Sequence, residues 1–284
     1  MGTKKSKLFI LGNGFDIAHE LPTHYSQFRS FLEQLQSTKP DEFNNQNRLS
    51  VISYFDDVCE GKDWKDIEHA LGLYPLFLED YNPKIDCRTE KKRYVFFQSF
   101  VLLELIDSFV EWANSISVED VTPNANFAQI IHDGDFAFLT FNYTPILEQI
   151  YKIPEDAICH IHGKQGSNVV MGHSQRDDAS LDLQLLDDVA PYLRQEFFKL
   201  FKNPIVNIRH NQDFFDSLTN LSEIYSYGFS FSDPDRAYIK LICEKATKKT
   251  VWYLSEYGTE ELRREYKDII YDSGFCGSVS SFSI

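Results

Sequence analysis

Residues 7–19 read KLFILGNGFDIAH, and this stretch decides how the rest of the chain is interpreted. Residues 7–11 form an apolar run that is long enough for a buried strand and too short for most helices. Gly12-Asn13-Gly14 interrupts the run before it resumes. A strand, a glycine turn and a helix open many nucleotide-binding α/β domains, because glycine lets the backbone approach a ligand and the helix start offers free N–H groups to an anion. The third glycine of the dinucleotide fingerprint is missing, so a tight turn without a ligand remains an alternative.

Asp16 lies in the first turn of the predicted helix. A carboxylate there stabilises a helix as an N-cap or through the helix dipole, but it also repels a phosphate at the same place. The alternatives are therefore a plain N-cap, a bridging cation, an anion bound elsewhere, or a carboxylate that binds ribose hydroxyls.

The composition is that of a globular protein of 284 residues, with 43% hydrophobic and 25% charged residues. Its net charge of -15 argues against broad binding to nucleic acid or to an anionic membrane, because both need a basic surface. The five cysteines are scattered without a CxxC pair, which favours reduced thiols over a disulfide framework or a zinc site. The apolar run after the N-terminus is too short for a signal peptide or a membrane span, so we expect a cytoplasmic protein with no membrane partner.

Helical spacing of apolar residues dominates the first half of the chain after this opening. It predicts helices at 25–35, 49–60, 64–73 and 91–115, the last with an aromatic stripe that we expect to be core. The predicted organisation is a Rossmann-like, nucleotide-binding domain from residues 1–36 and 131–284, with a helical insertion at 37–130.

Strand-like and helix-like stretches alternate in the second half, which implies an α/β, doubly wound, mostly parallel sheet. Strands are predicted at 136–141, 157–162, 168–172, 221–229 and 250–254, and helices near 145 and at 180–219, 234–247 and 260–271. The tail from residue 274 is either disordered or an added edge strand.

Three polar residues follow predicted strands: Asn13, Asn142 and His162. Ligands of doubly wound sheets lie beyond the carboxyl ends of the strands, so these residues mark the expected site. The Asn142 amide can hold a water molecule or a ribose hydroxyl, or it can cap the next helix.

The sequence Cys159-His160-Ile161-His162-Gly163 forms a second group. Strand alternation would place both histidines on one face, where a metal would need a third ligand, and only His173 is a candidate. We expect no metal site, and we expect His162, beside Gly163, to act as an acid or base.

The stretch 227–235, YGFSFSDPD, is the last candidate. Gly228 and Ser230 do not form a nucleophile elbow, which needs a second glycine two residues after the serine. We expect Ser230 to line the adenosine end of a nucleotide, and Ser232 or Asp233 to cap the next helix. The lysine-bearing phosphate loop of NTP hydrolases is absent from the sequence.

Together these stretches resemble the AbiH family of phage abortive-infection proteins. The resemblance rests on GNGFD at 12–16, LPT at 21–23 with YSxF at 25–28, TFNYT at 140–144 and HIHG at 160–163. More distantly, the chain is similar to sirtuin-like NAD-consuming domains, which share a glycine loop, an asparagine after a strand and a His-Gly pair. The first resemblance implies phage defence through host toxicity, and the second implies chemistry on NAD.

The resulting prediction is hydrolysis of the glycosidic bond of NAD or a related nucleotide, as substrate and without a required cofactor. Asn142 would orient a water or the ribose, and His162 would transfer a proton. The ligand would be held by Gly12, Asn13, Gly14, Asp16, Gly163, Gly228 and Ser230. A phage trigger or partner protein is expected, and assembly of several copies is implied by related effectors. The alternatives are a non-catalytic nucleotide-binding or phage-sensing module, and an RNA nuclease, which the acidic charge disfavours.

Overall fold

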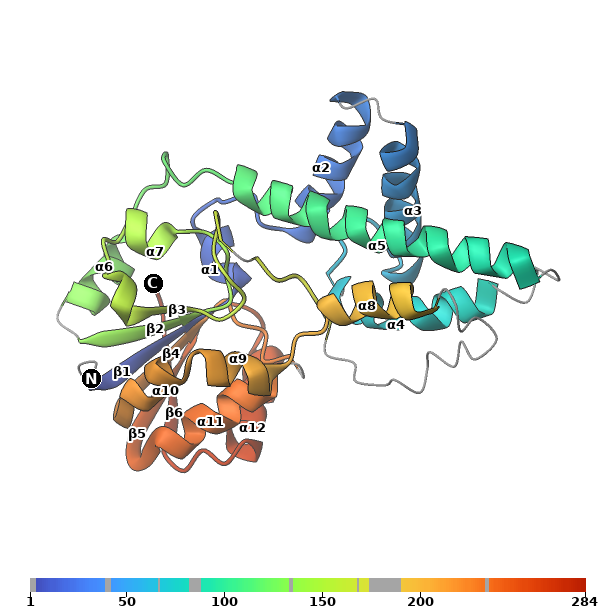
Figure 1. Cartoon of the computed structure of the whole chain (residues 1–284). Coiled ribbons are helices and arrows are strands. Elements are labelled where there is room, and N and C mark those ends of the chain that lie inside the picture. The colour runs from blue at the N-terminus through green and yellow to red at the C-terminus, as the bar shows by residue number, and fades with distance from the viewer. Residues whose placement is uncertain are drawn as a thin grey trace. The chain divides into compact units, whose positions relative to one another are not determined.

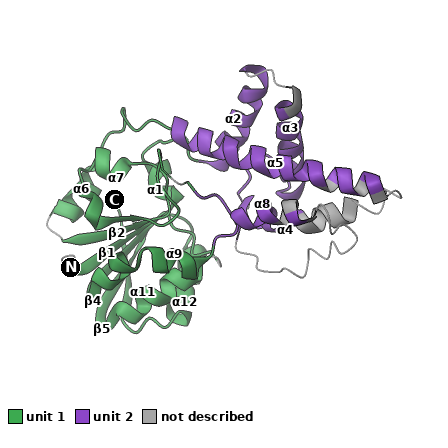
Figure 2. Cartoon of the chain, in the orientation of Figure 1, with its two compact units in different colours: residues 1–23, 116–169, 203–284 green, residues 24–115, 170–202 purple. Residues whose placement is uncertain are grey.

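The computed structural model describes residues 4–38, 42–65, 67–81, 88–132, 135–167, 169–173, 190–232 and 235–284. The chain divides into two compact units, coloured separately in Figure 2. The sheet unit consists of Met1–Thr23, Ile116–Val169 and Asn203–Ile284. The helical unit consists of His24–Ser115 and Val170–Lys202.

The described part of the sheet unit holds one sheet of six strands (Figure 1). The strands are β1 (Lys5–Leu11), β2 (Phe136–Thr140), β3 (Ile158–His160), β4 (Leu218–Tyr227), β5 (Ala246–Ser255) and β6 (Ser278–Phe282). Their order is β3-β2-β1-β4-β5-β6, and every neighbouring pair is parallel. The strand order reverses between β1 and β4, which is the doubly wound, Rossmann-like arrangement. The predicted fold class is confirmed.

Successive side chains of a strand point to opposite faces of the sheet, and helices pack on both faces. On one face, Phe9 of β1 packs edge-on against Phe127, with ring centroids 5.1 Å apart. On the other face, Leu8 joins a buried cluster with Ile239 and Ile270. The first face carries α1 (Asn13–Ala18), α6 (Ala125–His132) and α7 (Ile146–Gln149); the second carries α9 (Pro204–His210), α10 (Gln212–Ser217), α11 (Arg236–Lys245) and α12 (Glu260–Asp272).

The helical unit is built from α2 (Tyr25–Thr38), α3 (Glu42–Val58), α4 (Ile67–Tyr81), α5 (Arg88–Ser115) and α8 (Ala190–Lys199). Phe28 of α2 packs against Phe109 and Trp112 of α5, with both centroid distances 5.3 Å. The predicted aromatic stripe of α5 is therefore core at this end. Phe97, assigned to the same stripe, is instead 44% exposed. A step of four residues turns a helix by about 40° more than one full turn, so three such steps from Phe109 rotate Phe97 away from the core.

The boundaries of the units differ from those expected from the sequence. The helical unit begins at His24 rather than at 37, because α2 packs with α3 and α5. It also includes 170–202, since the backbone of His173 pairs with Leu200 and Lys202 in an isolated bridge region. This pairing replaces the strand predicted at 168–172, which is wrong for the described residues 169–172.

Two further expectations concern the second half of the chain. The helix predicted at 180–219 is three shorter helices from 190 onward, because new helices begin at Pro204 and Gln212 and β4 starts at Leu218; residues 180–189 lie outside the described part. The tail forms the edge strand β6, one of the two alternatives.

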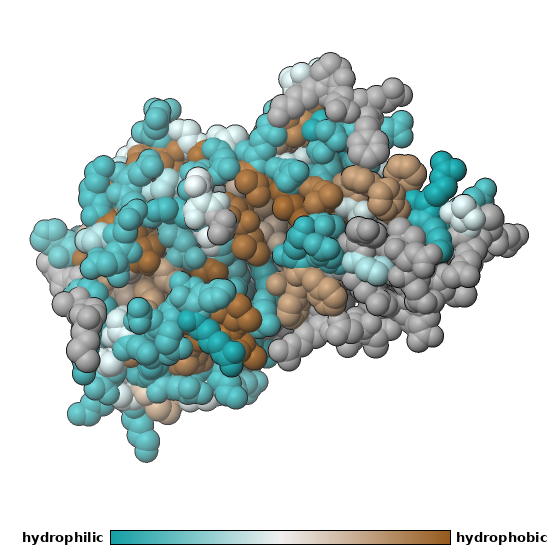
Figure 3. Space-filling model, viewed as in Figure 1, coloured by the Kyte–Doolittle hydropathy of each residue, from teal (hydrophilic) through white to brown (hydrophobic). Residues whose placement is uncertain are grey.

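Within the described residues, no helix combines the length and the apolar character that crossing a membrane requires. Hydrophilic residues predominate over the visible face of the sheet unit in Figure 3, in keeping with the net charge of -15.

Candidate functional site

The carboxyl ends of β1 to β4 bring most of the predicted site residues to one edge of the sheet. Gly12 follows β1, Asn142 lies two residues beyond β2, His162 lies two residues beyond β3, and Gly228 follows β4. Because β1 and β4 are neighbours, the switch point of the sheet lies between Gly12 and Gly228.

The glycine turn packs directly on the turn after β4. The Gly12 N–H donates to Tyr227 O and the Gly14 N–H to Gly228 O, each at 3.1 Å. A Cβ atom on Gly12 would lie 2.4 Å from Gly228 O, and one on Gly14 would lie 2.6 Å from Gly228 Cα. Gly228 itself has a φ of 61°, which an L side chain rarely adopts. This backbone contact alone requires glycine at positions 12, 14 and 228, as the alternative of a tight turn without a ligand expects. The ligand-binding role of Gly12, Asn13 and Gly14 stays a prediction.

Asp16 is a buried carboxylate, 1% exposed, at the centre of a hydrogen-bond network. Asn142 Nδ2 donates to Asp16 Oδ1 and Thr144 Oγ1 donates to Asp16 Oδ2, both at 2.8 Å. Burial raises the pKa of Asp16 to about 7, although the bonds from Thr144 and Asn142 act in the opposite direction. The N-cap alternative is wrong, because the N-cap of α1 is Gly12. Asp16 instead ties α1 to the end of β2.

Asn142 has both amide hydrogens engaged within the chain. Nδ2 donates to Gly12 O at 3.0 Å as well as to Asp16. Asn142 does not cap the following helix, whose N-cap is Pro145. Its side-chain oxygen is the group left to accept a hydrogen bond from a ligand.

His160 extends the network to Glu148 and Lys164, which form a partly buried ion pair. Its Nδ1 lies 3.0 Å from the Asn142 carbonyl oxygen and its Nε2 lies 3.1 Å from Glu148 Oε1. Both partners are hydrogen-bond acceptors, so the ring of His160 is held between two oxygen atoms. Lys164 Nζ also donates to Glu148 Oε1, at 3.0 Å. Burial opposes ionisation of Glu148, but the bonds from His160 and Lys164 outweigh it and lower its pKa to about 2.

His162 lies in a different environment, because β3 ends at His160 and strand alternation does not continue. Its ring is 4% exposed and lies 5.4 Å from the ring of Phe141 and 6.4 Å from that of Tyr238. Nε2 lies 3.9 Å from Asp235 Oδ1. The expectation that His160 and His162 share a face is therefore wrong.

The described residues contain no group of three or more His, Cys, Asp or Glu side chains arranged to hold a metal ion. His173, the third ligand considered from the sequence, belongs to the helical unit.

The turn after β4 places Ser230 at the surface beside a buried Phe229, whose ring packs on Phe141 at 4.6 Å. Ser232 Oγ donates to Asp235 Oδ2 at 2.9 Å, and the N-cap of α11 is Asp235 rather than Ser232. Asp233 lies outside the described residues. Gly163 has a φ of 85° in the turn after His162.

Sequence reasoning missed Thr144, Glu148 and Lys164 as members of the site. Thr144 lies within the quoted TFNYT stretch, but β2 ends at Thr140, so strand alternation gives no signal for its contact with Asp16. Glu148 and Lys164 give no local signal, because their importance arises only once β3 is placed beside β2.

A family model described as "Bacteriophage abortive infection AbiH" matches residues 8–256. This match runs from β1 to the end of β5 and includes every residue of the network around Asp16. The chain belongs to the AbiH family. Membership indicates an anti-phage abortive-infection role for the protein. Neither a curated protein nor a solved structure gives a significant match to the chain.

Proposed function

We propose that this AbiH protein binds NAD or a related nucleotide at the carboxyl edge of its sheet and hydrolyses the glycosidic bond. The observation that supports the proposal is the strand order, which places the glycine turn after β1 at the switch point next to β4. Crevices at such switch points are the usual ligand sites of doubly wound sheets. NAD is a substrate in this proposal, and no further cofactor is required.

His162 is the group proposed to transfer the proton, because imidazole both accepts and donates protons near neutral pH. Asp235, 3.9 Å away, stabilises the protonated ring. Asn142 acts mainly by position, since it holds the glycine turn on β2 and offers its side-chain oxygen to a ribose hydroxyl or a water. The raised pKa of Asp16 weakens its repulsion of a phosphate, because a carboxyl with a pKa of about 7 is only partly ionised at neutral pH. Gly163, Gly228 and Ser230 remain the proposed ligand-lining residues.

A second candidate is a non-catalytic module that binds a nucleotide or a phage protein. It is favoured by the hydrogen bonds of Gly14 N and of the Asn142 amide, which are satisfied within the chain. An RNA nuclease has less support, because the chain is acidic.

Turnover of NAD by the purified full chain, with and without phage lysate, tests the proposal. Release of nicotinamide is measured for the wild type, for His162→Gln and for His210→Gln, a matched control whose histidine is exposed in the same unit. Loss of a general acid or base typically lowers kcat by about 10²–10⁴-fold, so His162→Gln should lose activity while His210→Gln keeps it. NAD binding without turnover would favour the second candidate. Equal turnover by both variants would refute the assignment of His162, and neither binding nor turnover would refute the proposal.

A further inference from the structure

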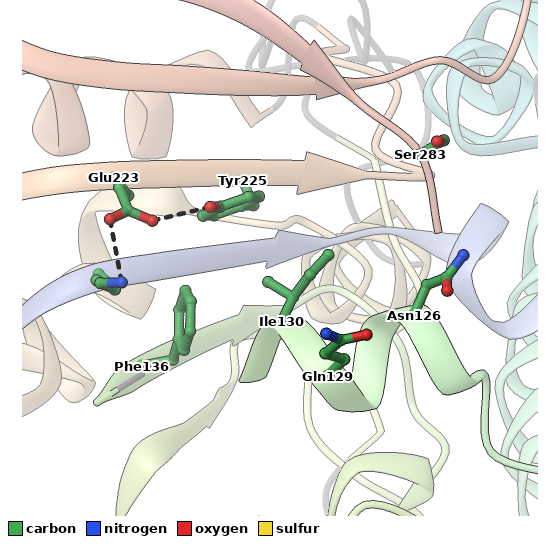
Figure 4. A pocket seen from close by; sticks show the side chains of 8 residues that line it. Asn126, Gln129, Ile130, Phe136, Glu223, Tyr225 and Ser283 are labelled. Atoms are coloured by element: carbon green, nitrogen blue, oxygen red, sulfur yellow. Dashed lines mark hydrogen bonds and ion pairs between the residues drawn. The ribbon is translucent and has the colours of Figure 1, made fainter. Parts of the chain in front are cut away.

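A hollow of about 440 Å³ lies on the α6 face of the sheet, shown in Figure 4. Lys7 and Phe136, near the amino ends of β1 and β2, line one part of it, and none of its lining residues belongs to the site proposed above. Its volume is within the range of about 300–1,000 Å³ that holds small ligands. Nothing in the proposed function uses it.

The charges in this hollow are already balanced. Lys7 Nζ lies 3.0 Å from Glu223 Oε1, and the Tyr225 hydroxyl donates to Glu223 Oε2 at 2.8 Å. Lys7 is the one cationic residue among the described residues that line the hollow, and it is paired with a carboxylate. A phosphate would meet no unpaired cation here, so the hollow fits an uncharged ligand.

The α6 wall presents two side-chain amides with unused hydrogen-bonding groups. Asn126 and Gln129 are exposed and three residues apart, so they lie on the same side of the helix, as Figure 4 shows. The capping of α6 is done by Asn124, whose Oδ1 accepts from Phe127 N at 3.0 Å, so neither amide is needed to hold the helix. A side-chain amide carries a donor and an acceptor side by side, which matches the N6 and N7 edge of adenine.

Phe136 and Tyr225 also line the hollow and supply apolar contact through the parts of their rings that remain uncovered, since Tyr225 stacks on Phe9 and Tyr253 at 4.7 and 4.6 Å. Phe136 of β2 and Tyr225 of β4 have ring centroids 5.8 Å apart at an interplanar angle of 69°. Aromatic side chains combined with amide groups are a common way to hold a nucleobase without charge. We propose that this hollow binds an uncharged purine base or nucleoside, held between the α6 amides and the rings of Phe136 and Tyr225.

Isothermal titration of the full chain with adenosine tests this proposal. The double variant Asn126→Ala/Gln129→Ala should bind adenosine at least tenfold more weakly, and alanine at exposed helix positions should preserve folding. Gln34→Ala, an exposed glutamine on α2, is the matched control and should bind like the wild type. AMP should bind no more tightly than adenosine, because the hollow has no unpaired cation.

Three results would overturn the proposal: no binding of adenosine or guanosine at millimolar concentration, unchanged binding by the double variant, or clearly tighter binding of AMP. Titration of His162→Gln separates this site from the carboxyl edge. Adenosine binding that survives in His162→Gln and is lost in the double variant supports the hollow, whatever the outcome for NAD turnover. Adenosine binding lost only in His162→Gln refutes it.

Discussion

Substitution of Gly12 by alanine tests the packing of the glycine turn against β4. Gly12 has φ −109° and ψ −176°, an extended conformation that alanine adopts without strain. The loss of stability should therefore come only from steric contact of the new Cβ atom with its neighbours. The new Cβ would lie 2.4 Å from Gly228 O, 2.7 Å from Phe229 Cα and 2.9 Å from Gly228 C, all of them backbone atoms.

The expected loss follows from how far these atoms must move. Ordinary Cβ contacts begin near 3.4 Å, so Gly228 O must retreat by roughly 1 Å. Overpacking of a core costs about 1–3 kcal/mol when side chains can adjust. Here both sides are hydrogen-bonded backbone, so Gly12→Ala should cost about 3 kcal/mol or more, which corresponds to a fall in Tm of about 6 °C or more.

The measurement is thermal unfolding of the purified protein, with hydrogen exchange of β1 and β4 to locate the effect. Gly166→Ala is the matched control in the same unit, because its φ is 73° but no atom lies within 4 Å of the new Cβ. Backbone strain alone should cost this control about 1–2 kcal/mol. The idea of a backbone-limited contact is wrong if Gly12→Ala is as stable as Gly166→Ala or more stable. It is also wrong if the free energy of unfolding of Gly12→Ala lies within about 0.5 kcal/mol of the wild-type value.

Three further predictions concern buried charges. Burial raises the Asp16 pKa from 3.8 to about 7, so between these pH values the folded state keeps a proton that the unfolded state loses. The free energy of unfolding should therefore fall by up to about 4 kcal/mol as pH rises from about 4 to 7. Denaturant titrations at several pH values measure this fall, and Asp16→Asn should remove it. Glu148 behaves oppositely, since its pKa is lowered to about 2: Glu148→Gln should lose about 1–3 kcal/mol at pH 7 by weakening the bond with His160, and a difference that does not shrink as pH falls from 4.5 toward 2 would contradict this. Arg48→Met leaves the Glu104 carboxylate buried without its ion pair and should lower the free energy of unfolding at pH 7 by about 3–5 kcal/mol. The double variant Arg48→Met/Glu104→Leu should regain much of this loss in thermal unfolding. A single variant as stable as the wild type would contradict the argument.

The sheet could be predicted from the sequence because buried parallel strands are continuous apolar runs. Residues 7–11 and 136–141 are such runs, and the structure places strands at both. The run at 168–172 has the same local character, but the structure has no strand at 169–172, and His173, directly after the run, pairs with Leu200 in the helical unit. Apolar character shows that a segment is buried, whereas the identity of its partner depends on the whole chain.

The network at the sheet edge shows where local reasoning ends. Asp16 could be assigned to a helix start from its neighbours, yet its hydrogen-bond partners Asn142 and Thr144 lie 126 and 128 residues away. Its burial, and therefore its raised pKa, results from that long-range contact. The orientation of His162 depended on a shorter stretch of chain. Strand β3 ends at His160, two residues earlier than expected, so the side chain of His162 does not follow the strand alternation.

The same network answers the objection that the charge of Asp16 raised against a phosphate ligand. Two carboxyl groups, Asp16 and Glu148, are joined through Asn142 and His160, and Glu148 also accepts a hydrogen bond from the Lys164 ammonium. Protonation of Asp16, whose pKa is raised to about 7, removes one negative charge from this network. A phosphate at this edge would favour the protonated form, because it removes a like charge. The carboxylate that made the glycine turn look unsuited to a nucleotide therefore has a pKa near neutral pH, so its charge can adjust to such a ligand.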